Sequence, residues 1–358
     1  MDSSTRFLFS NGTFLQTYEV PPVSSFLEAH PGAYTTTRTH DNASCVLLWE
    51  RHLKRLANSV KLLFDSSPKV LFGRSSWSTA HSSLSASIKS PQFELIIRCL
   101  VNENMSKVKP VVTKDTNIGH EWAITILISG NAEKLTGTVS LDEEKLSRAL
   151  DVHIHVGPYI PMVFGTIGAR LALAGRGRII AAAKHSDWVR SRKSLEKLRP
   201  PSVNELLLSN DGDHILEGSV TNFFVVCRRV EKSTDVKGST YSSFEVQTAP
   251  LGDGVLPGVI RQLVIEVCLD KGIPVKEVAP SWSIHECWEE AFVTSSLRLL
   301  QHVESIRAPS TWDPSESRSW NEIEWEEKQL KGGPGMITTI IQKEVTAKAF
   351  AEGYLMTS

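Results

Sequence analysis

Between residues 206 and 227, three short apolar runs follow one another with no room for a helix between them. The first two, 206–208 and 214–216, flank Asn210-Asp211-Gly212, a tight-turn signal, and the third is 222–227. Strands joined by such short links pair antiparallel, because a parallel connection needs a dozen residues or more. The order of elements therefore predicts an α+β fold of mostly antiparallel sheets with flanking helices, rather than a doubly wound parallel sheet.

The remaining elements are predicted from periodicity and from helix and strand boundaries. The sequence predicts a hairpin over 6–16 that turns at Asn11-Gly12, and helices at 47–64, 258–271 and 336–354. It predicts strands at 32–40, 93–101, 122–129, 175–183, 244–248 and 291–294. The polar stretches 75–90, 107–116, 229–243 and 312–333 are expected to be loops or surface connections.

Length and the proline pattern predict two domains. A chain of 358 residues can form two cores, and Gly157, Pro158 and Pro161 exclude a regular helix at 152–161. The expected division is a smaller N-terminal α/β domain at 1–150, an interdomain loop at 151–163 and a larger C-terminal domain at 164–358.

Composition limits the partners and the compartment. A formal net charge of -1 gives no basic field for nucleic acid, and no run approaches the roughly 18 apolar residues of a membrane helix. The five scattered cysteines and a start that leaves no room for a secretory signal predict a cytoplasmic protein, with an organelle not excluded. His153 and His155 have no third ligand at metal-site spacing, so no metal is expected.

Two residues in the second half could carry chemistry. Lys184 precedes a polar helix start, and Glu217 stands at the end of a short buried strand. Each taken alone is ordinarily a solvated charge. A lysine that can attack a carbonyl and a carboxylate that keeps a ring nitrogen protonated are, together, what a pyridoxal phosphate enzyme needs.

Three further segments could hold a phosphate. Gly258 opens a predicted helix, whose first N–H groups and positive dipole end favour an anion. Arg55 could add a charge-assisted pair, and 294–296 could add hydroxyl and backbone donors. Each signal alone is common in proteins that bind no phosphate.

Taken together, five ordered blocks resemble the fold type IV, or class IV, pyridoxal phosphate-dependent enzymes. That family contains branched-chain aminotransferases, D-amino acid aminotransferases and aminodeoxychorismate lyases. The blocks are His52-Leu53-Lys54-Arg55-Leu56-Ala57-Asn58-Ser59, Lys184, Glu217-Gly218-Ser219-Val220-Thr221-Asn222, Leu256-Pro257-Gly258-Val259-Ile260-Arg261 and Phe292-Val293-Thr294-Ser295-Ser296.

The resemblance implies a two-domain fold of the D-amino acid aminotransferase type, whose C-terminal domain binds pyridoxal 5'-phosphate, and a homodimer. It implies that Lys184 bonds to the cofactor and moves protons, and that Glu217 pairs with the pyridine nitrogen. The remaining implied cofactor residues are Arg55, Val259, Ile260, Ser295 and Ser296. Tyr34 and Arg98 are the implied substrate-binding residues.

The implied activity is transfer of an amino group between a small amino acid and a 2-oxo acid. A lyase that releases pyruvate from aminodeoxychorismate would share the same cofactor residues, and a cofactor-binding protein without turnover is a further alternative. The chain departs from the family at Ile260, where threonine is frequent, at Ser295-Ser296, where glycine-threonine is frequent, and at Trp188, near a frequent tyrosine.

Overall fold

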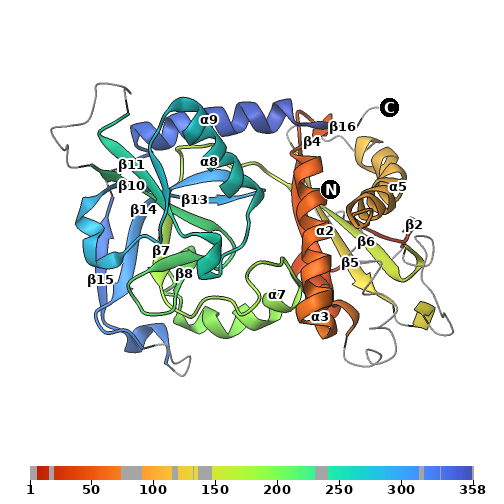
Figure 1. Cartoon of the computed structure of the whole chain (residues 1–358), viewed down its shortest axis with the longest axis horizontal. Coiled ribbons are helices and arrows are strands. Elements are labelled where there is room, and N and C mark those ends of the chain that lie inside the picture. Colours follow the sequence, from red (N-terminus) through yellow and green to blue (C-terminus); the bar gives the residue numbers. More distant parts are fainter. Residues whose placement is uncertain are drawn as a thin grey trace. The chain divides into compact units, whose positions relative to one another are not determined.

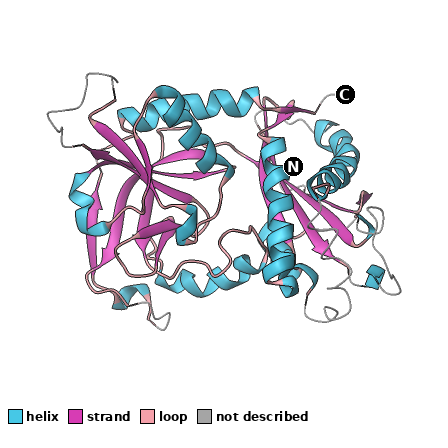
Figure 2. Cartoon of the chain, in the orientation of Figure 1, coloured by secondary structure: helices cyan, strands magenta, loops and turns pink. Residues whose placement is uncertain are grey.

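The computed structural model describes residues 6–15, 20–73, 91–114, 120–131, 133–135, 147–229, 241–313, 318–330 and 332–356. The chain forms two compact units. The first contains residues 1–161, 183–191 and 349–358, and the second contains 162–182 and 192–348. Each unit is built on its own β-sheet with helices against it (Figures 1 and 2).

The first unit is built on an antiparallel sheet whose described strands lie in the order β16-β4-β3-β5-β6-β1-β2. Its strands are β1 (Phe7–Ser10), β2 (Thr13–Phe14), β3 (Ala33–His40), β4 (Cys45–Val46), β5 (Glu121–Gly130), β6 (Leu150–Tyr159) and β16 (Tyr354–Leu355). Asn11 and Gly12 both take positive φ, as a tight hairpin turn requires, so the predicted hairpin between β1 and β2 is confirmed.

Helix α2 (Trp49–Ser66) is the main cover of that sheet. Its apolar positions Leu53, Leu56, Val60 and Leu63 are fully buried, and the helix packs against β3 and α5. The predicted helix at 47–64 is therefore confirmed. The other helices of this unit are α1 (Val23–Ala29), α3 (Pro68–Phe72), α5 (Phe93–Lys114), α7 (Asp187–Ser191) and the short η1 (Glu133–Leu135).

The second unit is built on a larger sheet that closes on itself. The described strands lie in the order β12-β11-β10-β13-β14-β7-β8-β9, and β9 pairs back to β10, so six strands form a ring. They are β7 (Ala169–Leu173), β8 (Glu205–Ser209), β9 (Ile215–Gly218), β10 (Asn222–Arg228), β11 (Phe244–Thr248), β12 (Val275–Glu277), β13 (Trp288–Ser295), β14 (Leu299–Pro309) and β15 (Trp325–Gln329), which pairs with β14.

The apolar core of this unit lies on one face of the ring strands and includes Leu171, Leu207, Phe223, Val225 and Val293. Outside the ring, α8 (Val259–Lys271) packs against β13 (Figure 1). The remaining helices are α9 (Met336–Ala351) and the short η2 (Arg192–Leu198), η3 (Leu251–Asp253), η4 (Trp282–Cys287) and η5 (Trp320–Glu322). Most sheet pairings are antiparallel, with β7–β8, β7–β14 and β11–β12 parallel, so the predicted fold class is confirmed.

The structure corrects several local predictions. Residues 93–101, predicted as a strand, and most of 107–116, predicted as a polar connection, belong to α5. Residues 175–183 form turns and bends and not a strand. Strand β6 runs through residues 151–159, within the segment predicted as the interdomain loop, and the division into domains stays a prediction. The predicted surface connection at 312–333 contains β15.

The predicted loop at 75–90 and most of that at 229–243 lie outside the described residues. Among the helices that the structure describes, none is both long and apolar enough to cross a membrane.

Candidate active site

Lys184 is held through its backbone in the first unit. Its carbonyl accepts the N–H of Tyr34 at 2.9 Å, and its N–H donates to Ser59 Oγ of α2 at 3.1 Å. The next residue, His185, forms an isolated bridge with Ala33. The lysine is thus tied to the first residues of β3 and to α2, which fixes where its side chain starts.

The Lys184 amine lies over the face of Tyr34, with 4.8 Å between Nζ and the ring centroid. Tyr34 is itself buried in a small apolar cluster of this unit. The structure therefore brings together two residues that sequence analysis assigned to different roles, the reactive lysine and a substrate-binding tyrosine.

Arg55 lies at the end of a short polar chain in the same unit. Its Nη2 donates to Thr35 Oγ1 at 2.6 Å, and Thr35 Oγ1 also bonds to His52 Nδ1 at 2.8 Å. Burial lowers the pKa of His52 well below its usual value, and the positive charges of Arg55 and Lys184 lower it further. His52 is therefore a neutral support for Arg55 and adds no third positive charge.

Glu217 lies where the ring of strands closes in the second unit. It pairs with Asn222 across β9 and β10, and it is 2% exposed. Its Oε2 accepts the N–H of Leu256 at 3.0 Å and Asn222 Nδ2 at 3.3 Å. The predicted carboxylate is therefore fixed in direction by the strand closure and by the segment that leads into α8.

Arg178 is a partner of Glu217 that sequence analysis missed. Its Nε and Nη2 lie 2.8 and 2.7 Å from Glu217 Oε1, and both side chains are almost fully buried. Arg178 also donates to the carbonyl of Ala181 at 3.2 Å. A buried guanidinium at this distance stabilises the carboxylate form of Glu217. An arginine directly after Gly177, six positions before the lysine, was the one available signal.

The N-terminus of α8 has the features of an anion site. Its N-cap is Gly258, which makes no side-chain capping bond, and no acidic residue lies in its first turn. A Cβ on Gly258 would lie 2.0 Å from Asn222 Oδ1, so only glycine allows Asn222 to lie this close. The backbone N–H groups of Val259 and Ile260, at the start of α8, are therefore not occupied by a capping side chain.

The third predicted phosphate segment follows β13. Thr294 is the register partner of Asn222, and its buried Oγ1 has no hydrogen-bond partner among the described residues. Ser295 Oγ accepts the N–H of Arg298 at 3.3 Å, so this hydroxyl supports its own turn. The orphaned hydroxyl of Thr294 and the uncapped start of α8 fit an anionic group such as the expected cofactor phosphate.

Arg98 belongs to α5 in the first unit. It stands on the exposed side of α5, ion-paired with Glu50 and 4.0 Å from Glu94. Its predicted contact with a substrate carboxylate is not tested by this placement and stays a prediction.

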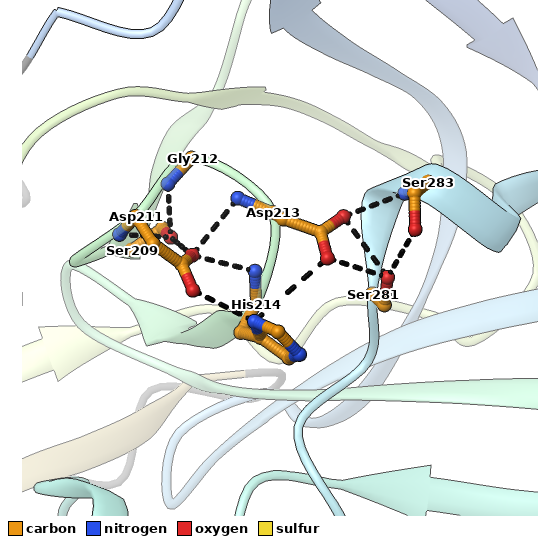
Figure 3. Close-up of polar contacts among 7 residues, drawn as sticks. All are labelled: Ser209, Asp211, Gly212, Asp213, His214, Ser281 and Ser283. Atoms are coloured by element: carbon orange, nitrogen blue, oxygen red, sulfur yellow. Dashed lines mark hydrogen bonds and ion pairs between the residues drawn. The ribbon is translucent and has the colours of Figure 1, made fainter.

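A cluster of serine, aspartate and histidine in the second unit has the composition of a catalytic triad, but a different geometry (Figure 3). His214 Nδ1 lies 2.7 Å from Asp211 Oδ2, whereas Ser281 Oγ bonds to Asp213 at 2.7 and 2.9 Å. The serine hydroxyls shown therefore meet aspartates or each other, and not the imidazole. The cluster anchors the turn before β9, the strand that carries Glu217.

His153 and His155 alternate on β6, as the sequence predicts. Burial and nearby His30 lower the pKa of His153 to about 4, and His155 Nε2 bonds to the carbonyl of Pro21 at 2.9 Å. In the part of the chain that the structure describes, no three histidine, cysteine, aspartate or glutamate side chains form a metal site.

Comparisons with known proteins agree with these features. The family model described as amino-transferase class IV matches residues 32–306. No curated protein sequence matches the chain.

Solved structures share the fold at low sequence identity. A hypothetical aminotransferase from Mycobacterium tuberculosis matches with a TM-score of 0.62 and 15% identity, covering 97% of this chain and 100% of that one. The branched-chain aminotransferase of Escherichia coli matches at 0.60 and 16%, covering 98% and 99%. That of Thermoproteus uzoniensis, solved with norvaline, matches at 0.58 and 17%, covering 99% of both chains.

Proposed function

Because the chain belongs to the class IV aminotransferase family, we propose that it transfers an amino group between a small amino acid and a 2-oxo acid. The family is pyridoxal phosphate-dependent. The observation that supports the proposal most is Glu217, a buried carboxylate that accepts bonds from Arg178 and from the Leu256 N–H.

The bound cofactor supplies a carbonyl for the amine and a ring that accepts electrons from the substrate Cα. Glu217, kept charged by Arg178, holds a proton on the ring nitrogen. Lys184 Nζ takes the proton from the substrate Cα and returns a proton, as a general base and then a general acid. The base role needs the neutral form of the amine, and lysine can lose its charge where it is partly buried, as Lys184 is.

We assign the phosphate to Arg55, to the N–H groups of Val259 and Ile260, and to the segment Thr294–Ser296. Arg55 is oriented by Thr35 and contributes a fixed positive charge. The start of α8 contributes backbone donors, which need no side chain at the position of Ile260. The departure from the family's usual threonine therefore costs one hydroxyl donor and leaves the backbone site intact.

The substrate class is supported by the relatives. The Thermoproteus uzoniensis enzyme was solved with norvaline, and the Mycobacterium tuberculosis protein was solved with alpha-ketoglutarate and PMP. We propose that Tyr34 and Arg98 contact the substrate, as the family resemblance implies.

The resemblance also supports a homodimer. The five cysteines, which are free in the structure, support the cytoplasm as the compartment.

The test is a panel of L- and D-amino acids mixed with the pure protein and pyridoxal phosphate. We expect at least one donor to bleach the visible band of the bound cofactor and to yield its 2-oxo acid. If no donor of either hand does so while the visible band is present, transamination is wrong. Release of pyruvate from aminodeoxychorismate without such an exchange would instead identify a lyase.

A further inference from the structure

Glu205 is a buried carboxylate of the second unit that the proposed reaction does not use. It is the first residue of β8 and is 3% exposed. Removing a carboxylate from water is costly unless hydrogen bonds or an opposite charge compensate it. The groups that compensate Glu205 therefore show which parts of the unit this carboxylate connects.

One oxygen of Glu205 holds the connection between β9 and β10. Its Oε1 accepts the Val220 N–H at 2.8 Å and the Thr221 hydroxyl at 2.9 Å. Val220 is 41% exposed, so side-chain packing contributes little to fixing this connection. Hydrogen bonds to a charged acceptor are stronger than neutral ones, and both of these fall between Glu217 and Asn222.

Gly218 allows the carboxylate to lie beside the backbone of β9. A Cβ on Gly218 would lie 2.4 Å from Glu205 Oε1 and 2.2 Å from Thr221 Oγ1. Gly218 is the last residue of β9 and directly follows Glu217. The position of Glu205 therefore depends on glycine at the residue next to the proposed partner of the ring nitrogen.

The other oxygen of Glu205 connects to the turn after β13. Arg298 Nη1 lies 3.4 Å from Glu205 Oε2 and 3.3 Å from Gln301 Oε1. The backbone N–H of Arg298 donates to Ser295 Oγ at 3.3 Å, within the segment that we assign to the phosphate. Glu205 thus links two segments of the second unit that are assigned to opposite ends of the cofactor.

We propose that Glu205 is a positioning residue, which sets the direction of Glu217 by holding the connection between β9 and β10. The bonds from Asn222 Nδ2 and from the Leu256 N–H to Glu217 need this connection in its observed place. The catalytic consequence rests on the proposed aminotransferase function, because a small misplacement of a reacting group can cost about 10²-fold in rate.

The first measurement is hydrogen exchange of single backbone amides in the full-length protein, which needs no turnover. Glu205→Leu keeps a similar size but has no acceptor. We expect the Val220 amide to exchange about tenfold faster or more, as loss of a hydrogen bond to a charged group implies. The Leu256 amide should also exchange faster, although its acceptor is Glu217 and not Glu205.

Two further variants separate positioning from general stability. Glu205→Gln keeps an oxygen that can accept both bonds, so it should retain the protection of Val220 and Leu256. Glu245→Leu is the matched control. Glu245 is also a buried carboxylate of this unit, 2.8 Å from Lys276, but it pairs with Cys227, at the opposite end of β10 from Asn222. The control should leave the exchange of the Leu256 amide unchanged.

The second measurement is steady-state kinetics with an amino donor and saturating pyridoxal phosphate. We expect Glu205→Leu to lower kcat about tenfold or more, with little change in KM for the donor, and Glu205→Gln to restore kcat. If Glu205→Leu does not fold, Thr221→Val removes one donor to Oε1 and should change exchange and kcat in the same directions, by less.

The possible results separate this proposal from the proposed function. Unchanged exchange of the Leu256 amide in Glu205→Leu, or in Thr221→Val where the first variant does not fold, would overturn the positioning role. An equal change in Glu245→Leu would also overturn it. Faster exchange with wild-type kcat would overturn the catalytic consequence. Faster exchange in a protein that transaminates no donor would support the positioning of Glu217 and contradict the proposed function instead.

Discussion

At the residue scale, the proposed site depends on polar side chains that hold other polar side chains in place. Thr35 Oγ1 bonds to both Arg55 and His52, and Arg178 holds Glu217. These supporting residues lie far from their partners in sequence, so no local sequence motif predicts the contacts. The proposed reactive residues could be predicted from ordered family blocks, whereas Arg178 and Thr35 became visible only in three dimensions.

The hydroxyl of Thr35 should matter for cofactor binding. Thr35→Val keeps the shape of a buried β3 residue but removes the acceptor of Arg55, and a hydrogen bond to a charged group contributes about 1.5–3 kcal/mol. We expect the dissociation constant for pyridoxal phosphate to rise by about tenfold or more, measured by the visible absorbance of the bound cofactor.

Thr36→Val is the matched control, because Thr36 bonds to Thr125 instead. Its cofactor affinity should remain that of the wild-type protein. Equal affinities for all three proteins would contradict the role of Thr35.

The pair of Glu217 and Arg178 links stability to catalysis. Glu217→Gln leaves a buried guanidinium without its counter-charge, and breaking such a pair costs about 3–5 kcal/mol. We expect the free energy of unfolding in urea to fall by a few kcal/mol. Turnover should fall by a factor of about 10² or more, because acid–base contributions of this kind are typically that large.

Adding Arg178→Met to Glu217→Gln should restore part of the stability without restoring turnover. Glu327→Gln removes an exposed partner of Arg307 and serves as a control that should change both quantities little. Full activity in Glu217→Gln would show that this carboxylate does not support the ring nitrogen.

At the element scale, the sequence predicted helices and strands where a segment was long enough to show the repeating spacing of apolar residues that marks a helix or a strand. The strand prediction at 93–101 was wrong because the window was short. Ile97, Val101, Met105, Val108 and Val112 are fully buried at helical spacing, but Leu95-Ile96-Ile97 alone looks like a strand. Pro110 within α5 concealed the continuation of the helix.

The start of α8 offers a test at this scale. Gly258→Ala would place a Cβ 2.0 Å from Asn222 Oδ1, so the helix start must shift away from β10. We expect the variant to bind phosphate more weakly. The inhibition constant of inorganic phosphate, measured in competition with pyridoxal phosphate, should rise at least fivefold. Gly252→Ala, where a Cβ meets nothing within 4 Å, should have no effect. Equal inhibition in both variants would contradict an anion site at α8.

At the scale of the whole molecule, the closure of β9 on β10 determines where Glu217 lies. The sequence predicted both strands and the turn before them but not that they close a ring, because the pairing of β14 with β7 and of β7 with β8 joins strands distant in sequence. The long strand β14 was not predicted at all. The predicted domain boundaries remain a prediction.

The turn before β9 should make the stability of the protein depend on pH. The hydrogen bond to Asp211 raises the pKa of His214. Partial burial acts to raise the pKa of Asp211, but hydrogen bonds from His214 and from backbone N–H groups lower it overall. The pair is therefore charged at pH 5. The contribution of the pair to the free energy of unfolding is complete at pH values below the ordinary histidine pKa of about 6.5. It is lost as the pH rises through the raised pKa of His214.

We expect His214→Asn to lower the free energy of unfolding at pH 5 by less than about 1 kcal/mol, since the pair is exposed, and by less at pH 9. Urea titrations at both values check this. A larger loss at pH 9 than at pH 5 would contradict the assignment, as would no weakening of the effect in high salt at pH 5.

The central claim is that Lys184 carries the proton transfer on a bound pyridoxal phosphate. The direct measurement is a single-turnover reaction of the holoprotein with an amino donor that the panel identifies, followed at the visible band of the cofactor. Lys184→Ala should bind the cofactor without its lysine-dependent band and should yield no 2-oxo acid. The exposed control Lys197→Ala should react as the wild-type protein does. Formation of the 2-oxo acid by Lys184→Ala at the wild-type rate would contradict the account.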